Sequence, residues 1–445
     1  MFKKLANLLD IDFDIGNTLI LRLWSTFSGG LLVLMIPTFL SASEQGYYFT
    51  FSSIIGMQIF FELGFNFVIT QMISHKMAHV HLANNRLSGN KKDINDIYHL
   101  VSLLLKWYSV ISILFFVIVF CIGLYFFEQH GSLPKGEWLM AWLLIVLFSA
   151  VNLFLSPFLS VLEGMGLVGK VAQMRLMQSV VGFIILSGLF LMHFRLNSLP
   201  AITGCAALFS LVYLFLYYDK ILFKPIKEKK EIEQEDKISW RRDILPFQWK
   251  IAISWLSGYF IFQLFNPLIF AHQGPVEAGK VGLSLTIFTT ILTLSISWVN
   301  AKVPLIAQSI ARGDKAKVNP LFRKLMLKSV CINILGSLSF IIAVLILKHY
   351  HVYITERLVD VKTLCLLLFI NIINHIVFCC AAYMRAHKTE PLLYSSLATG
   401  VIVGISVYFT SKYSVFYTML AYLLTLAIVC MPWTLMLFRK FYRHN

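Results

Sequence analysis

The chain has 445 residues, of which 58% are hydrophobic and only 13% are charged, and its mean hydropathy is +0.75. A soluble domain is nearer half apolar and a quarter charged, so this composition excludes a water-soluble protein and indicates a membrane protein. The formal net charge of +16 would suit nucleic acid. The basic residues flank apolar segments, however, where they would lie beside anionic lipid headgroups, so we expect membrane lipids as partners and no nucleic acid.

The N-terminal segment, residues 1–14, carries Phe2 and three leucines on one helical face, with lysines and aspartates around them. This pattern is typical of a short interfacial helix that leads into a first membrane span. A cleavable signal peptide is not expected here.

Twelve apolar segments follow, and each is long enough to cross a bilayer, which takes about 20 residues of helix. They lie near residues 17–40, 47–73, 100–127, 138–162, 171–192, 198–218, 247–270, 280–303, 327–347, 360–384, 391–411 and 415–437. The sequence therefore predicts an all-α, polytopic membrane protein with about twelve transmembrane helices.

The lysines and arginines fall mostly on one side of these spans. With a cytoplasmic N-terminus, 28 of the 38 lie in the tails and inward loops, and only seven lie in the outward loops. Cytoplasmic loops collect positive charge, so the sequence predicts that both termini are cytoplasmic.

A charged segment, 219–246, divides the spans into six before it and six after it. Its mixed charge is typical of a solvated linker. We therefore predict a bundle at 1–218, a cytoplasmic linker at 219–246 and a second bundle at 247–445. A second inward loop, 74–99, is rich in His, Asn and Lys.

The two halves share a weak sequence repeat. The second span is preceded by Glu44-Gln-Gly46-Tyr and the eighth by Glu277-Ala-Gly279-Lys, each at the first outward turn of its half. Since each half has an even number of spans, the repeat would be parallel, and two such bundles can rock to give alternating access. The alternative is that apolar helices resemble one another by composition alone.

Polar residues inside the spans are the candidates for a site, because such residues are costly in lipid and usually face a cavity or a partner. Gln58, Glu62 and Asn66 follow each other at intervals of four residues, so they share one helical face. They could line a cleft or bond neighbouring helices. Arg22, near the inner end of the first span, could extend to the headgroups or pair with Glu62.

Further candidates lie on later spans, and cations outnumber acids among them. Glu62 is the only acid well inside a span, whereas Glu163 lies at an inner edge. Such a bias predicts a site for an anion such as a phosphate or diphosphate. The further candidate residues are Arg175, Lys250, Gln263, Asn266, Lys302 and the trio Asn371, Asn374 and His375, which shares one face.

Motifs for other chemistry are missing. The run His75-x-x-x-His79-x-His81 has the spacing of a metal site but no neighbouring Cys or acid in the sequence, so we expect no metal there. No nucleotide-binding loop or hydrolase motif is present, so we expect no cofactor, no catalytic residues and no ATP-driven step. The seven cysteines fall inside spans, where we expect apolar filler and no disulfides.

Three segments resemble the O-antigen (Wzx-type) polysaccharide flippases of the multidrug/oligosaccharidyl-lipid/polysaccharide exporter superfamily, and the resemblance covers essentially the whole chain. They are Phe61-Glu-Leu-Gly-Phe-Asn66, Leu162-Glu-Gly-Met-Gly166 with the following Arg175-Leu-Met-Gln178, and Leu245-Pro-Phe-Gln-Trp-Lys250 with Trp255-Leu-Ser-Gly258. The second-helix acid of that family is often Asp, and here it is Glu62.

The resemblance implies a V-shaped pair of six-helix bundles in the bacterial inner membrane, with a cationic cavity that flips undecaprenyl-diphosphate-linked oligosaccharide. A polysaccharide polymerase and a chain-length regulator would be its protein partners. Three alternatives stay open. One is a drug or cation antiporter of the same superfamily, which would need more acids than Glu62. Another is a polysaccharide polymerase or ligase, which the short outward loops disfavour. The third is a scaffold for glycosyltransferases.

Overall fold

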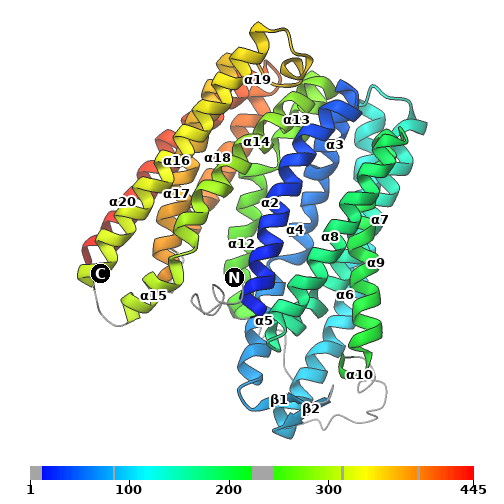
Figure 1. The fold of residues 1–445 in the computed structure, drawn as a ribbon, viewed down its shortest axis with the longest axis vertical. Helices are drawn as coiled ribbons and strands as arrows, with labels where there is room; N and C mark the ends of the chain where they lie inside the picture. Colours follow the sequence, from blue (N-terminus) through cyan, green and yellow to red (C-terminus); the bar gives the residue numbers. More distant parts are fainter. Residues whose placement is uncertain (1–12, 84–85, 223–244, 312–314, 388–390, 445) are drawn as a thin grey trace, which may run out of the picture. The chain divides into compact units, whose positions relative to one another are not determined.

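The structure is a computed structural model that describes residues 13–83, 86–222, 245–311, 315–387 and 391–444. Within these residues it is almost wholly α-helical (Figure 1). Eleven of the helical segments described are long and apolar enough to cross a membrane, and a bent pair, Ala42–Glu62 with Phe65–Lys76, makes up to twelve spans. The prediction of an all-α, polytopic membrane protein is thus confirmed.

The helices of the first half are continuous rods except in the second span. In order, they are α2 (Phe13–Phe39), α3 (Ala42–Ile55), the short turn η1 (Gly56–Gln58), α4 (Ile59–Glu62), α5 (Phe65–Lys76), α6 (Lys91–His130), α7 (Lys135–Gly164), α8 (Val168–Leu191), the turn η2 (Arg195–Ser198), α9 (Pro200–Tyr217) and α10 (Asp219–Leu222).

The second half contains the remaining helices and one π-helical turn, η6. They are α12 (Leu245–Phe262), α13 (Phe265–Gln273), α14 (Pro275–Asn300), α15 (Val303–Ala311), α16 (Lys315–His349), the turn η5 (Tyr353–Arg357), α17 (Val361–Ala386), α18 (Leu393–Thr410), α19 (Val415–Thr425), η6 (Leu426–Cys430) and α20 (Met431–His444).

Local sequence signals fix where several of these helices begin. Pro200 and Pro275 occupy the first positions of α9 and α14, where a missing N–H costs nothing. The side chains of Asp360 and Ser414 accept hydrogen bonds from backbone amides in the first turns of α17 and α19. The long apolar runs between such signals become helices because a helix satisfies its own backbone polar groups in lipid.

The second span is broken at Leu63 and Gly64, which both adopt left-handed backbone conformations, with φ of 49° and 68°. Glycine tolerates this conformation and leucine does so at a cost in conformational energy. The break bends the span by 44° between α4 and α5. It coincides with the Phe61–Asn66 segment, so this sequence motif marks a change of direction at membrane depth.

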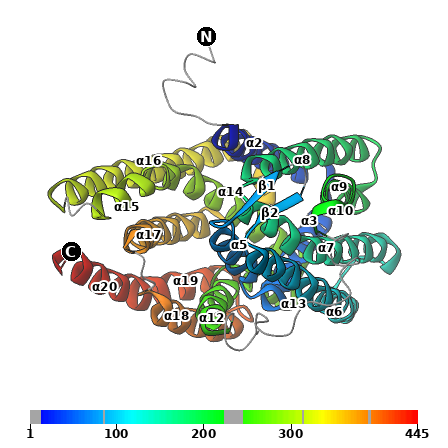
Figure 2. The ribbon, with the colours of Figure 1, turned by 90° about the horizontal axis from the view of Figure 1, so that it is seen from below.

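The loop 74–99 contains a β-hairpin that the sequence did not predict. Strands β1 (Val80–Ala83) and β2 (Arg86–Gly89) pair antiparallel, with Val80 opposite Gly89, and Figure 2 shows them beside α5. The 40-residue helix α6 follows at once, and it is about 60 Å long at the α-helical rise, roughly twice the hydrocarbon thickness. This helix is therefore longer than the bilayer core can cover.

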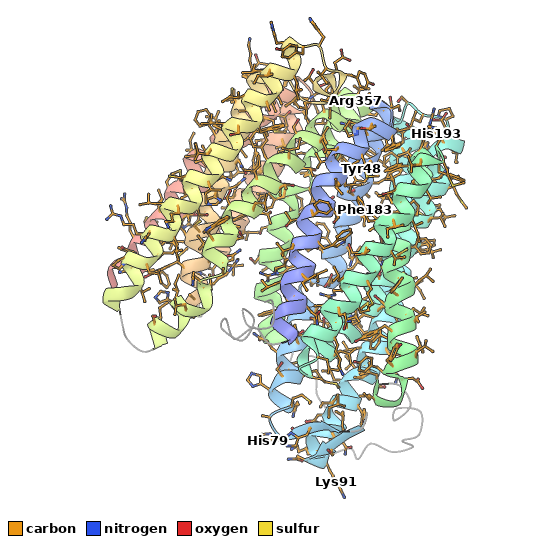
Figure 3. The ribbon with its side chains drawn as sticks, viewed as in Figure 1. Tyr48, His79, Lys91, Phe183, His193 and Arg357 are labelled. Carbon is orange, nitrogen blue, oxygen red and sulfur yellow. The ribbon has the colours of Figure 1, made fainter. Side chains whose placement is uncertain are left out.

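Ion pairs join α5 and α6, the two helices that flank this hairpin. The ammonium of Lys76 lies 3.0 Å from Asp93 and 2.5 Å from Asp96, and His79, labelled in Figure 3, lies 3.5 Å from Asp93. The fold thus brings an acid beside the histidine run, which the sequence did not indicate. Among the described residues, no group of three or more His, Cys, Asp and Glu side chains could hold a metal.

The chain folds into two compact units. The first unit is residues 1–28, 55–128 and 134–255, and the second unit is 29–54, 129–133 and 256–445. The second unit therefore includes the end of α2 and most of α3, which the prediction by chain order placed in the first bundle. The interfacial segment 1–14 and the linker 219–246 lie largely outside the described residues.

Each unit has its own buried aromatic core. In the first unit, the ring of Phe127 packs against Trp138 and Trp142, with centroids 5.4 and 5.5 Å apart. In the second unit, Phe322 packs against Tyr383 at 4.6 Å. By contrast, many large apolar side chains along the spans are exposed, which is the surface that lipid would cover.

Candidate functional site

The break in the second span gathers three of the predicted site residues. The carboxylate of Glu62 accepts hydrogen bonds from the side chains of Gln58 and Asn66. The amide nitrogen of Asn66 also donates to the Ser156 hydroxyl of α7 at 3.0 Å. The spacing of four residues that the sequence showed therefore becomes a hydrogen-bonded cluster around one acid, which we call the Glu62 cluster.

A polar ladder below this cluster fixes α5 against α7. Beyond the Asn66–Ser156 bond, the hydroxyl of Thr70 donates to the Ser160 carbonyl and that of Ser74 to the Gly164 carbonyl, each at 3.3 Å. The bonds repeat every four residues because both helices present one face to the other. Such small polar residues let helices approach closely in lipid, and the ladder therefore holds the Glu62 cluster in place.

Arg22 does not pair with Glu62, although the sequence left that pairing open. No ion pair joins these two described residues, and the Glu62 carboxylate is bound by amides instead. The side chain of Arg22 is exposed. The same helix is anchored nearby, where the Trp24 indole donates to the Ser179 hydroxyl of α8 at 3.0 Å.

Arg175 forms an ion pair that the sequence did not predict. Its guanidinium lies 3.1 Å from the Glu163 carboxylate, and their side chains are 41% and 23% exposed. The pair joins the end of α7 to the start of α8. It reduces the charge that Arg175 alone would present, because the two opposite charges largely cancel at a distance.

Most of the other predicted cations and amides lie at breaks or ends of helices. Lys302 is exposed after the end of α14, and Gln263 is exposed between α12 and α13. The amide of Asn266, in α13, donates to the Ser53 hydroxyl at 3.3 Å within the second unit. Lys250 lies in α12, and its side chain lies outside the described residues.

Asn371, Asn374 and His375 form a buried neutral network in the second unit, which we call the α17 network. Asn371 donates to Asn333 at 3.4 Å and to Ser337 at 3.2 Å on α16, and Asn374 donates to the Tyr422 hydroxyl at 3.3 Å. His375 Nε2 lies 2.7 Å from the Ser329 hydroxyl. All three residues are less than one-tenth exposed, so they line no open surface in this structure.

The partners of this network were missed from the sequence. Ser329, Asn333 and Ser337 lie at intervals of four on α16 and are fully buried, so their spacing was a usable signal. His375 Nδ1 and Asn333 Nδ2 are buried without a hydrogen-bond partner among the described residues. Buried polar atoms are usually hydrogen-bonded, so we expect these two atoms to gain partners if the network rearranges.

The predicted residues thus form two groups. The first unit holds Arg22, Gln58, Glu62, Asn66, Arg175 and Lys250, and the second unit holds Gln263, Asn266, Lys302, Asn371, Asn374 and His375. Within each unit the structure brings together a subset: the Glu62 cluster in the first and the α17 network in the second. Both combine hydrogen-bond donors and acceptors, and the α17 network is closed to the surface in this structure.

Comparisons with known proteins identify the fold and not the family. No family model matches the chain, and no curated protein does. Solved structures do match. An inward-facing multidrug resistance MATE family transporter of the MOP superfamily aligns over 94% of this chain and 96% of that one, with 12% identity and a TM-score of 0.63.

Two further solved structures have the same fold. The lipid II flippase MurJ, in an inward closed conformation, aligns over 95% of this chain and 87% of its own, with 8% identity and a TM-score of 0.63. A MOP superfamily transporter from Pyrococcus furiosus Vc1, described as having a binding pocket of reverse polarity, aligns over 95% and 93%, with 13% identity and a TM-score of 0.54. The chain therefore has the fold of MOP-superfamily transporters.

Proposed function

We propose that this chain is a membrane transporter that moves a lipid-linked, anionic oligosaccharide across a bacterial inner membrane. The chain shares its fold with a lipid II flippase, and its membrane-depth residues carry more cations than acids. That cation excess is the observation on which the proposal rests. A diphosphate and a hydrated sugar are each costly to move through hydrocarbon, so the protein must shelter both from lipid.

The substrate we propose is undecaprenyl-diphosphate-linked oligosaccharide, with the repeat unit of O-antigen or a related surface polysaccharide as its sugar. Arg22, Arg175, Lys250 and Lys302 would hold the phosphates or anionic sugars. Gln58, Asn66, Gln263 and Asn266 would bind sugar hydroxyls, and Asn371 and Asn374 would do so if the α17 network opens. The polyprenyl tail would stay in lipid, and no covalent chemistry is needed.

The deciding experiment is to delete the gene and follow surface glycan. We expect the glycan to disappear from the cell surface while its lipid-linked repeat unit accumulates inside. In the complemented strain, the double variant Arg22→Ala, Arg175→Ala should lose surface glycan while membrane levels of the protein stay normal. The matched control is Lys348→Ala, an exposed cation of the α16 end, which should display glycan normally. Normal display in the double variant would contradict the anion-binding assignment.

The second candidate function is a multidrug or cation antiporter, because one of the similar structures is a multidrug resistance transporter. The Glu62 cluster favours this candidate, since an acid inside a span can exchange a proton or sodium ion against a cation. Resistance to cationic dyes separates the two functions. If overexpression raises dye resistance and Glu62→Gln abolishes it while glycan display is unaffected, the antiporter is the better assignment.

A further inference from the structure

The helices α3 and α14 meet in the second unit at two glycines, where backbone packs directly against backbone. A Cβ atom on Gly46 would lie 1.9 Å from the Pro275 carbonyl oxygen, and one on Gly279 would lie 2.9 Å from the Gly46 nitrogen. Both glycines have ordinary backbone angles, so their role is close approach and not turn geometry. Any larger residue here must push α3 and α14 apart.

The predicted sequence repeat places these two glycines at matching positions. Gly46 belongs to Glu44-Gln-Gly46-Tyr, and Gly279 belongs to Glu277-Ala-Gly279-Lys. Both motifs lie at turns that the charge distribution predicts to face outward. In a parallel repeat, equivalent positions meet only near the symmetry axis, so the meeting of these two motifs supports the predicted repeat.

Side chains tie the same junction together. The amide of Gln45 donates to the Gly279 carbonyl at 2.8 Å and to the Arg357 carbonyl at 3.2 Å. Arg357 Nη2 in turn donates to the Leu40 carbonyl at 3.0 Å, at the turn between α2 and α3. Figure 3 shows Arg357 at this end of the helices. Three separate chain segments are therefore linked through Gln45 and Arg357.

Arg357 is buried in this junction with most of its hydrogen-bonding capacity unused. The residue is 5% exposed, and its Nε and Nη1 atoms have no hydrogen-bond partner among the described residues. Its guanidinium lies 5.0 Å from the centre of the Tyr353 ring, which offers partial compensation only. A buried cation in this state is destabilising, and an anion with two oxygens would satisfy the planar fork.

We propose that this junction is a latch and that Arg357 is its anion-binding group. In the closed latch Arg357 holds the Leu40 carbonyl, and in the open latch its guanidinium binds phosphate-type oxygens in place of that carbonyl. The closed latch and anion binding are then mutually exclusive. An anion therefore binds the open latch more tightly than the closed one and favours opening. The identity of the anion as a substrate diphosphate rests on the proposed function, whereas the latch itself does not.

The latch is tested by labelling a cysteine at Thr50, one helical turn from Gly46. Thr50 is fully buried and its hydroxyl has no partner among the described residues, so Thr50→Cys breaks no bond known there. The seven native cysteines are free thiols and are replaced first. A membrane-impermeant maleimide applied to purified protein in detergent should label this cysteine slowly. Adding Gly46→Ala should speed labelling at least about fivefold, the lower end of typical coupling between two sites.

The matched control is Gly29→Ala in the same background, because a Cβ atom there meets nothing within 4 Å. It should leave the labelling rate unchanged. A cysteine at the 78%-exposed Tyr413 reports the reagent's own reactivity. Equal rates in Gly46→Ala and Gly29→Ala would overturn the latch, provided that both variants elute as intact monodisperse protein. If Gly46→Ala fails to fold, Gln45→Ala, which removes both amide bonds, replaces it with the same expected result.

The anion-binding group is tested with inorganic pyrophosphate in the same assay, against sodium chloride of equal ionic strength. Pyrophosphate should accelerate labelling of the Thr50→Cys protein by about fivefold or more. Arg357→Gln should abolish this response, and Arg357→Lys should keep a weaker one, since an ammonium lacks the fork. A response that persists in Arg357→Gln, or none in the protein with Arg357, would overturn the assignment. Neither result depends on glycan transport, so the deletion experiment above judges the proposed function separately.

Discussion

The Glu62 cluster and the α17 network place polar groups at membrane depth in opposite ways. The Glu62 cluster lies at a break in the helix, keeps an acid, and is half-buried. The α17 network lies on an unbroken helix, contains no acid or lysine among the side chains described above, and is almost fully buried. The contrast shows that a similar spacing of polar residues in a sequence can form two different structures. One is a charged site near a helix break, and the other is a buried neutral network between helices.

The largest effect is expected when a charge is introduced into the neutral α17 network. Asn371→Asp should destabilise the second unit by about 3 kcal/mol or more, because its partners Asn333 and Ser337 cannot neutralise a carboxylate. Thermal unfolding in detergent measures the effect. The matched variant, Glu62→Gln, removes a charge and should change stability by only about 1 kcal/mol. The comparison fails if Glu62→Gln proves the more harmful of the two.

The helix break is tested by replacing two glycines with alanine, one at the break and one in a continuous helix. Gly64→Ala should cost about 1 kcal/mol, because Gly64 has a positive φ that alanine adopts poorly. Gly258→Ala, in the continuous helix α12 with nothing near the added Cβ, should instead stabilise by about 0.5 kcal/mol. The measurement is the unfolding midpoint of each variant. If both midpoints shift in the same direction, the conclusion that Gly64 is required at the break is wrong.

The polar ladder is measured by a double-mutant cycle between Asn66 and Ser156. Replacing each by alanine, singly and together, should give a coupling of about 0.6 kcal/mol, the average for hydrogen bonds between membrane helices. Repeating the cycle in a Glu62→Gln background tests whether the acid orients Asn66. A coupling that stays unchanged there would indicate that the ladder forms independently of the Glu62 cluster.

The smallest effect is expected at the Glu163–Arg175 ion pair, because both side chains are partly exposed. Glu163→Gln should change stability by no more than about 0.5 kcal/mol, and less at high salt. If this variant nevertheless alters surface glycan display, Arg175 acts on the substrate and not on the fold. A large loss of stability would instead show that the pair is a structural tie between α7 and α8.

Much of the fold could be read from the sequence. The apolar runs, each near the thickness of a bilayer, determined the spans, and the four-residue spacing of Gln58, Glu62 and Asn66 determined that they share a face. The hairpin at Val80–Gly89 could not be predicted, since its two strands are only four residues long and carry no clear alternation.

The partners of the candidate residues could not be predicted either. Glu62 pairs with side-chain amides on either side of it in the same span and not with Arg22, and Arg175 pairs with Glu163 across a turn. Sequence places a side chain on a face of one helix, but which neighbouring helix covers that face depends on packing.

The sequence by itself determined that this chain spans a membrane, where its spans lie and which residues are polar within them, because hydrophobicity and helical period are local properties. Only the tertiary structure decided that Gly46 meets Gly279, that Arg357 is buried with unused donors, and that Asn371 faces α16. Those contacts join residues far apart in the chain, and they are selected by close packing and by the need to satisfy buried polar groups.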